Sequence, residues 1–442
     1  MPKQRVIQLV ALAVSCTGYI WIGYYVERAD FIQFLAAYSL LFGVYLFMLY
    51  KGNLADNFMF VIGGALLLRA SLFFMTPNLS DDYFRFIWDG QVVASDNNPY
   101  LLTPSALIGS GQTIPGITQA LFEQLNSPVY YSAYPPICQY IFGLSAKING
   151  SNITGNILLI RFFILLAEFG TIILLYRLAR IFKLPQTAVL IYALNPLVII
   201  ELTGNLHFEA IMIFLLLLAV YLLVRERMVW SAISFALAIG TKLIPVIFLP
   251  LLIKRLGKGR SASYFAIVGV TILLFSIPFL NLQAVSNYLS SIGLYFQAFE
   301  FNASIFYALK SASAQLASDS IVNTSLVLLP ILSLTTIVII AVRERRADWQ
   351  SLFSSMLFCL TAYLLFSTFV HPWNIVPLVM LTVFTGYEYV IPWSFVIALS
   401  YSAYQALPYS ENLWFVAIEY ITLGGWMVYE LRTKLAKLFR RR

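Results

Sequence analysis

Three aspartates lie close together in a chain that contains few charged residues. Asp81, Asp82 and Asp89 fall, with Asp96 further on, within the stretch NLSDDYFRFIWDGQVVASDNNPY (78–100), whereas only 11% of the 442 residues are charged. A carboxylate that is held in position can take a proton from an attacking hydroxyl as a general base. An aspartate at the start of a helix can also simply stabilise that helix by its charge. The stretch therefore predicts either an acid–base site or a stabilised helix end.

The residues around these aspartates have helical spacing. The run from Asp81 to Val93 is expected to form a helix with Ser80 as its N-cap. On this helix Asp82, Arg85 and Asp89 share one face, because they are three or four residues apart. In the structural alternative, Arg85 pairs with Asp82 and neither residue does chemistry.

Other ionisable residues fall near the expected outer ends of apolar segments. Each alone is more often an interfacial residue than a functional one. Charge inside a membrane is costly, however, so a group of such residues indicates a site. The group comprises both histidines (His207, His371), the acids Glu201 and Glu209, and the cations Arg69, Arg161 and Lys242.

The elements that carry these residues must be membrane helices. The chain is 60% hydrophobic and has a mean hydropathy of +0.81, which predicts an all-α polytopic membrane protein with one transmembrane domain over 1–442. The three cysteines lack the spacing of a metal site or a disulfide framework. Apolar segments fall at 6–26, 31–50, 57–76, 157–182, 187–203, 207–224, 229–253, 262–280, 321–342, 350–370, 373–387, 390–407 and 412–431.

The net charge of +8 is best explained by lysines and arginines in cytoplasmic loops, so we expect no nucleic-acid partner. Simple alternation of spans places KRLGKGR (254–260) outside, against that rule. A break of the segment 229–253 at GTK (240–242) into two half-length helices restores it. The expected topology has about 12–14 membrane segments, both termini cytoplasmic, and two external loops. The first loop, 77–156, carries the acidic motif on interfacial helices, and the second covers 281–320.

The motif in the first loop resembles that of bacterial GT-C fold glycosyltransferases, in particular the polyprenol-phosphate-mannose-dependent mannosyltransferase group. NPLVIIELTGNLHFEAIMIFLLLLAVYLL (195–223), GTKLIPVIFLPLL (240–252), FEFNASIFYAL (299–309) and HPWN (371–374) resemble later segments of that group in order. Phe86, where the group often has Tyr, and Asp96-Asn97, where a Gly commonly stands, depart from it and bear on the subfamily and acceptor. The matching residues of the first loop are Asp81, Asp82, Arg85, Phe86, Trp88, Asp89, Gly90, Asn98, Pro99 and Tyr100.

The resemblance implies an inverting transfer of a sugar, mannose in that group, from a polyprenyl-phosphate donor, with the base in the first external loop. That base is Asp82 or Asp81. We prefer Asp82 because it shares a helix face with Arg85 and Asp89. The cations expected to bind the donor phosphate are Arg85, Lys242, His371 and Arg161. The residues expected to bind substrate are Asp89, Trp88, His207, Glu209, Glu201, Asn205, Tyr100, Asn302 and Trp373.

No cofactor is expected, although carboxylates of this kind could hold a divalent metal. The resemblance favours metal-independent transfer, because a monophosphate leaving group needs less charge neutralisation than a diphosphate. The expected partners are the lipid-linked donor, a glycolipid, glycan or protein acceptor, and membrane lipids. The expected location is the bacterial inner membrane, with the active site on the periplasmic side.

Two other classes of protein remain open. A transporter or flippase for a lipid-linked sugar could use the same arginines and lysine to bind phosphate, but it would place its charges near the membrane midplane. A structural membrane subunit does not explain why charges of both signs gather at the outer face.

Overall fold

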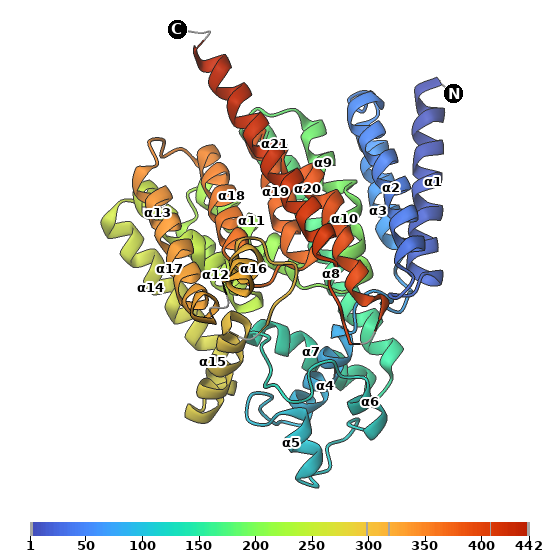
Figure 1. Ribbon diagram of the computed structural model, residues 1–442, viewed down its shortest axis with the longest axis vertical. Coiled ribbons are helices and arrows are strands. Elements are labelled where there is room, and N and C mark those ends of the chain that lie inside the picture. Colours follow the sequence, from blue (N-terminus) through green and yellow to red (C-terminus); the bar gives the residue numbers. More distant parts are fainter. Residues whose placement is uncertain (1–2, 298, 317–318, 407, 440–442) are drawn as a thin grey trace. The chain divides into compact units, whose positions relative to one another are not determined.

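The computed structural model describes residues 3–297, 299–316, 319–406 and 408–439. These residues form helices and short connections without a β-strand (Figure 1). An isolated bridge joins Phe301 to Phe369. The predicted all-α polytopic membrane fold is confirmed. The described chain forms two compact units, of which unit 1 comprises Met1–Leu68, Ala179–Ile199 and Phe299–Arg442, and unit 2 comprises Arg69–Leu178 and Ile200–Ala298.

Unit 1 contains the N-terminal and C-terminal helices. Its elements are α1 (Lys3–Tyr25), α2 (Phe31–Lys51), most of α3 (Phe58–Ala70), η1 (Gln186–Val189), α9 (Leu190–Ala193), α10 (Pro196–Val198), α16 (Ile305–Gln315), α17 (Asp319–Arg343), α18 (Trp349–Leu365), α19 (Pro372–Thr385), α20 (Val390–Val396), η5 (Ile397–Gln405) and α21 (Leu413–Phe439).

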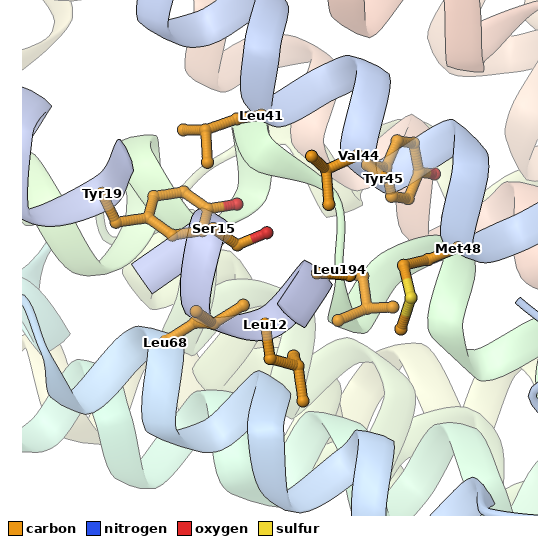
Figure 2. A pocket seen from close by; sticks show the side chains of 10 residues that line it. Leu12, Ser15, Tyr19, Leu41, Val44, Tyr45, Met48, Leu68 and Leu194 are labelled. Atoms are coloured by element: carbon orange, nitrogen blue, oxygen red, sulfur yellow. The ribbon is translucent and has the colours of Figure 1, made fainter. Parts of the chain in front are cut away.

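A small pocket lies among the first three helices of unit 1 (Figure 2). Leu12, Ser15 and Tyr19 of α1, Leu41 of α2 and Leu68 of α3 help to line it. None of the predicted site residues lines this pocket. Its walls are mainly aliphatic and aromatic, as expected where membrane helices pack, and it offers no convergent charges for a phosphate.

Unit 2 contains the helices of the first external loop and the predicted broken helix. Its elements are α4 (Asp82–Ala94), α5 (Pro104–Gly109), α6 (Gln119–Glu123), α7 (Pro136–Asn149), most of α8 (Ile153–Ile181), most of η2 (Ile199–Gly204), α11 (Glu209–Val224), α12 (Met228–Thr241), η3 (Ile244–Phe248), α13 (Leu249–Leu256), α14 (Lys258–Ser276), η4 (Ile277–Phe279) and α15 (Leu282–Gln297).

Helices α4 and α7 pack at very close range because two glycines face the contact. A Cβ atom on Gly90 would lie 2.5 Å from the carbonyl oxygen of Phe142. A Cβ atom on Gly143 would lie 2.5 Å from Val93. The rings of Phe86 and Phe142 stack beside this contact with centroids 4.8 Å apart. The glycine of the Trp-Asp-Gly motif is therefore explained by helix packing, which holds the acidic helix on α7.

The helix break predicted at GTK (240–242) is present. Helix α12 ends at Thr241, and Lys242 has extended backbone angles (φ −150°, ψ 140°). Pro245 supplies the reason, since its ring clashes with the carbonyl four residues earlier in a continuous helix and it lacks an N–H group. The chain continues through η3 into α13, which is 8 residues long.

Fewer helices reach spanning length than predicted. Among the described residues, five helices are long and apolar enough to cross a membrane by length and composition, and a pair bent by 51° (Gln186–Ala193 and Pro196–Gly204) would make six. Helices lie at the predicted apolar segments, but several are shorter than the roughly 20 residues that a bilayer requires. Five apolar helices of the described chain have only 10–17 residues. The protein is an integral membrane protein.

The two predicted external loops are largely helical. Residues 77–156 contain α4, α5, α6 and α7 and the start of α8, and residues 281–320 contain α15, α16 and the start of α17. Residues 298 and 317–318 of the second loop lie outside the described residues.

Candidate functional site

Helix α4 begins one residue later than predicted. Asp81, and not Ser80, occupies the N-cap position, and its side chain makes no capping hydrogen bond. The Ser80 hydroxyl still accepts the backbone N–H of Asp82, at 3.4 Å. The difference arises because Asp81 has backbone angles outside the helical region (φ −95°, ψ 1°). Asp82 is therefore the first helical residue, where its charge is favourable to the helix.

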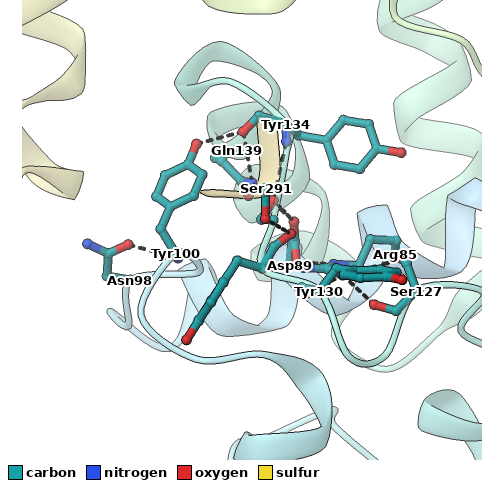
Figure 3. Close-up of polar contacts among 11 residues, drawn as sticks. Arg85, Asp89, Asn98, Tyr100, Ser127, Tyr130, Tyr134, Gln139 and Ser291 are labelled. Atoms are coloured by element: carbon teal, nitrogen blue, oxygen red, sulfur yellow. Dashed lines mark hydrogen bonds and ion pairs between the residues drawn. The ribbon is translucent and has the colours of Figure 1, made fainter. Parts of the chain in front are cut away.

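The aspartates of α4 have different surroundings. Asp82 is partly exposed, and its Oδ1 accepts a hydrogen bond of 3.0 Å from Nδ2 of Asn126. Asp89 is only 1% exposed. Its carboxylate accepts hydrogen bonds from Arg85 (2.8 Å), Ser132 (2.5 Å) and Gln139 (3.1 Å), as Figure 3 shows in part. Asp82 is accessible for chemistry, whereas Asp89 is engaged in a buried network.

Arg85 ties the loop before α7 to the acidic helix (Figure 3). Its Nε donates to Asp89, and its Nη1 donates to the carbonyl oxygens of Ser127 (3.0 Å) and Tyr130 (3.1 Å). Its ion pair is thus with Asp89, four residues later on α4, and not with Asp82. A buried guanidinium of which Nε and Nη1 are engaged is suited to positioning a loop.

The Asn-Pro-Tyr motif is also an anchor. Asn98 Nδ2 donates to the carbonyl oxygen of Phe279, at 2.9 Å, and Tyr100 Oη donates to that of Tyr134, at 2.6 Å. Burial raises the pKa of the Tyr100 phenol well above its usual value, with smaller contributions from nearby groups such as Asp89. The phenol therefore remains a hydrogen-bond donor, and Tyr100 fixes the backbone of Tyr134.

Lys242 lies at the helix break with an acid beside it. Its Nζ is 2.9 Å from Oε1 of Glu209 and 5.8 Å from the ring centroid of Tyr134. The side chain of Lys242 is 22% exposed, whereas that of Glu209 is 1% exposed. Asp82 adds a further attraction to the Lys242 charge. Unit 2 therefore brings Asp82, Lys242, Glu209 and Tyr134 into one electrostatic neighbourhood.

Arg161 is enclosed by backbone carbonyls. Its guanidinium donates to Phe73 (2.7 Å), Met75 (2.5 Å), Thr203 (2.9 Å) and Gly204 (3.1 Å), and the residue is 0% exposed. It joins the residues after α3 to the C-terminal end of η2. This arrangement satisfies the carbonyls that a helix end leaves open.

Glu201, Asn205 and His207 form a separate buried cluster. Glu201 Oε2 accepts from Asn205 Nδ2 at 3.2 Å and lies 3.4 Å from Nε2 of His207. All three residues are at most 2% exposed. Trp88, on α4, is also 2% exposed, and its ring centroid is 6.0 Å from that of Phe122. These predicted substrate residues are covered by protein in this structure.

The remaining predicted residues belong to unit 1. The His371 ring stacks between Phe301 (4.5 Å between centroids) and Trp373 (4.3 Å). His371 is also the N-cap residue of α19, where its backbone N–H donates to Oδ1 of Asn374 (2.8 Å) and its carbonyl oxygen accepts the backbone N–H of Asn374 (2.9 Å). A neutral imidazole has one nitrogen that can donate and one that can accept.

Asn302 lies in a network of acids that the sequence reading missed. Its backbone N–H donates to Glu411 at 2.5 Å, and its Nδ2 donates to Glu419 at 3.1 Å. Trp393 Nε1 also donates to Glu419, at 2.8 Å. Tyr307 donates to Glu411, and burial raises the pKa of the Glu411 carboxyl. Glu419 could have been identified from the sequence, because it is an acid inside the apolar run 412–431.

Several residues of unit 2 were also missed. Arg69, which the sequence marked as a candidate, forms a buried ion pair of 2.9 Å with Glu168, which it did not mark. The aspartates of α4 contact three uncharged residues, Asn126, Ser132 and Gln139. Residue type alone does not mark these three as members of a site. The part of the chain that the structure describes holds no group of three or more His, Cys, Asp or Glu residues arranged for a metal.

Comparison with known proteins places this chain in a family. A family model described as "Alpha-(1->6)-mannopyranosyltransferase, N-terminal domain" matches residues 21–257. The chain belongs to this family. The match confirms the resemblance seen in the sequence, and it includes the acidic helix and Lys242. His371, Trp373 and Asn302 lie beyond it.

Two relatives are named Alpha-(1->6)-mannopyranosyltransferase A. The protein from Mycobacterium tuberculosis is 25% identical over 223 residues, which cover 48% of this chain and 41% of that protein. The protein from Corynebacterium glutamicum is 24% identical over 191 residues, which cover 43% of this chain and 37% of that protein. The similarity to this chain therefore spans about two fifths of each relative.

Proposed function

We propose that this protein is a membrane mannosyltransferase. It transfers mannose from a polyprenyl-phosphate donor to a hydroxyl group of a glycolipid, glycan or protein acceptor, with inversion at the anomeric carbon. Membership of the mannopyranosyltransferase family supports the activity. We place it in the bacterial inner membrane, and the distribution of lysine and arginine supports a periplasmic active site and cytoplasmic termini.

The observation that carries the proposal is that two groups of opposite charge are neighbours: Asp82, whose carboxylate is accessible, and the cation Lys242. The acceptor oxygen attacks the anomeric carbon, and its proton passes to the Asp82 carboxylate. The bond between the sugar and the phosphate oxygen breaks, and polyprenyl phosphate leaves with the bonding electrons. Lys242 stabilises the negative charge that develops on this phosphate. Asp81, directly before α4, is the alternative base.

The other predicted phosphate ligands divide into two groups. Arg85 and Arg161 donate to backbone carbonyls and are largely satisfied, so we assign them to positioning. The imidazole of His371 can donate a hydrogen bond to an anion, so we assign it to a phosphate oxygen or a sugar hydroxyl. The assignment of His371 rests on its surroundings in unit 1 alone.

Glu209 is the strongest candidate for contact with the sugar. Its Oε2 is buried and has no hydrogen-bond partner among the described residues. A buried acceptor without a partner is costly, and a sugar hydroxyl would satisfy it. We assign Asn302 and Trp373 to substrate contacts as well, and we assign Asp89, Trp88, Tyr100, Glu201, Asn205 and His207 to the support of the site. No metal is required, because Lys242 can balance a monophosphate.

The test is an assay in proteoliposomes with polyprenyl-phosphate [14C]mannose and a crude membrane-lipid acceptor fraction. The proposal predicts covalent transfer of label to the acceptor, abolished in Asp82→Asn. Movement of the labelled donor across the bilayer without covalent transfer would indicate a transporter and would overturn the proposal.

A further inference from the structure

Helix α15 carries an exposed apolar stripe. Leu282, Val285 and Leu289 are 93%, 41% and 60% exposed. They recur at three- and four-residue spacing and form one stripe. A second exposed stripe beside it is polar and consists of Gln283, Ser286 and Ser290. The helix therefore has three faces: an exposed apolar face, an exposed polar face, and a face that packs on the rest of unit 2.

The packed face of α15 holds two loops of the candidate site. Asn287 Nδ2 donates to the carbonyl oxygens of Tyr100 (2.9 Å) and Leu101 (3.2 Å). Ser291 Oγ donates to the carbonyl oxygen of Tyr131 at 3.0 Å, beside the network of Figure 3. The Tyr288 ring packs edge-on against Tyr100, with centroids 5.3 Å apart. Polar side chains are buried here because they satisfy loop carbonyls.

The start of α15 lies close to the end of a candidate membrane span. That span is Lys258–Phe279, and α15 begins three residues later, at Leu282. Asn281 turns the chain, since its Oδ1 accepts the backbone N–H of Gln283 at 2.8 Å. A helix that starts where a span ends begins at the bilayer surface.

We propose that α15 is an in-plane helix at the bilayer surface. Its apolar stripe enters the boundary between headgroups and acyl chains, its polar stripe faces water, and its third face holds the loops of the site. The sequence of α15 contains no Lys, Arg, Asp or Glu. The lipid contact is therefore apolar, and it does not depend on anionic lipid.

This contact would connect the bilayer to the candidate site. Asn287 and Tyr288 hold Tyr100, Tyr100 donates to the carbonyl of Tyr134, and the Tyr134 ring faces Lys242 at 5.8 Å. Asn287 and Ser291 are thus positioning residues. Their relevance to donor binding rests on the proposed function, whereas the location of α15 does not.

The location can be tested by spin labelling in phosphatidylcholine proteoliposomes. A nitroxide is attached to Leu289→Cys or, as the matched control, to Ser286→Cys, in protein whose three native cysteines are replaced by alanine. Collision with lipid-soluble O2 relative to water-soluble NiEDDA should be severalfold higher at 289 than at 286. Equal accessibility to NiEDDA would overturn the proposal. Exclusion of both probes at 289 would also overturn it, since a second copy or another protein would then cover the stripe.

The connection to the loops needs a second measurement. A nitroxide on Tyr130→Cys, whose native side chain is 48% exposed, reports the mobility of the loop held by Ser291. Leu289→Asp and Asn287→Leu should each increase its mobility, whereas Ser286→Asp should not. If Leu289→Asp does not fold, Leu289→Ser makes the same comparison with a smaller change. Unchanged mobility in all these variants would refute the role of α15 in holding the loops.

Discussion

Lys242 and Glu209 join the helix break to the first turn of α11, with Nζ and Oε1 2.9 Å apart. The acid is buried and the lysine reaches partly into the open. A charge held in this way is pre-oriented by its buried partner, and its exposed side remains available to a second anion. We propose that this second anion is the donor phosphate.

Lys242→Ala should raise the KM for donor. A charge-assisted hydrogen bond to a buried phosphate contributes about 1.5–3 kcal/mol, which corresponds to roughly a ten- to 150-fold change. Lys147→Ala, which removes an exposed lysine at the end of α7, is the matched control and should leave KM unchanged. Steady-state kinetics with varied donor concentration measure both. An unchanged KM in Lys242→Ala would remove the lysine from the donor site.

Asp89→Asn should damage stability more than chemistry. The substitution leaves the buried Arg85 guanidinium without its anion, and loss of one partner of a buried ion pair costs about 3–5 kcal/mol. The folded yield and the melting temperature in detergent should fall, while KM for donor in the surviving folded protein should stay near that of the parent. A raised KM at unchanged melting temperature would instead place Asp89 or Arg85 on the substrate.

His371→Asn separates capping from donation. Asparagine is a good N-cap residue, so the start of α19 is retained. The donor nitrogen of the imidazole is lost, and the amide group of the shorter asparagine side chain does not reach as far toward the substrate. Specific activity per folded molecule should fall while yield is maintained. If activity falls only in proportion to the amount of folded protein, His371 is a structural residue.

The topology predicts which residues face the outside of the cell. A cysteine at Ser110, in the loop after α5, should react with an impermeant maleimide applied to intact spheroplasts. A cysteine at Gly257, between α13 and α14, should react only after the membrane is opened. The reverse labelling pattern would show that the protein has the opposite orientation in the membrane, with the candidate site on the cytoplasmic side.

Much of the fold could be predicted from hydrophobic patterning, because long apolar runs become helices wherever a bilayer excludes water. The break before Pro245 was also predictable, since proline disrupts a helix locally. Among the described residues, the helices of spanning length are fewer than the apolar runs. Apolar runs such as 390–407 are divided by backbone geometry, into α20 and η5, and composition does not encode that division.

The candidate site was predictable by residue type but not by partner. The sequence placed Asp82, Arg85 and Asp89 on one face, and the structure distinguishes them by burial. What Asp89 contacts depends on Ser132 and Gln139, roughly 45 residues away, and no local pattern predicts such a contact. The roles of Asn98 and Tyr100 likewise depend on carbonyls of Phe279 and Tyr134. Arg161 was assigned to phosphate because it is a cation, whereas its partners here are backbone carbonyls, which every residue possesses.

Turnover of Asp82→Asn tests the central claim most directly. The substitution keeps the size of the side chain and removes the proton acceptor, so turnover should fall by roughly 10²–10⁴-fold, with donor binding and folded yield retained. Asp81→Asn, one residue before the helix, should cost far less. The opposite result for the two variants would move the base by one residue. Full activity in the double variant Asp81→Asn/Asp82→Asn would contradict a catalytic role for this helix.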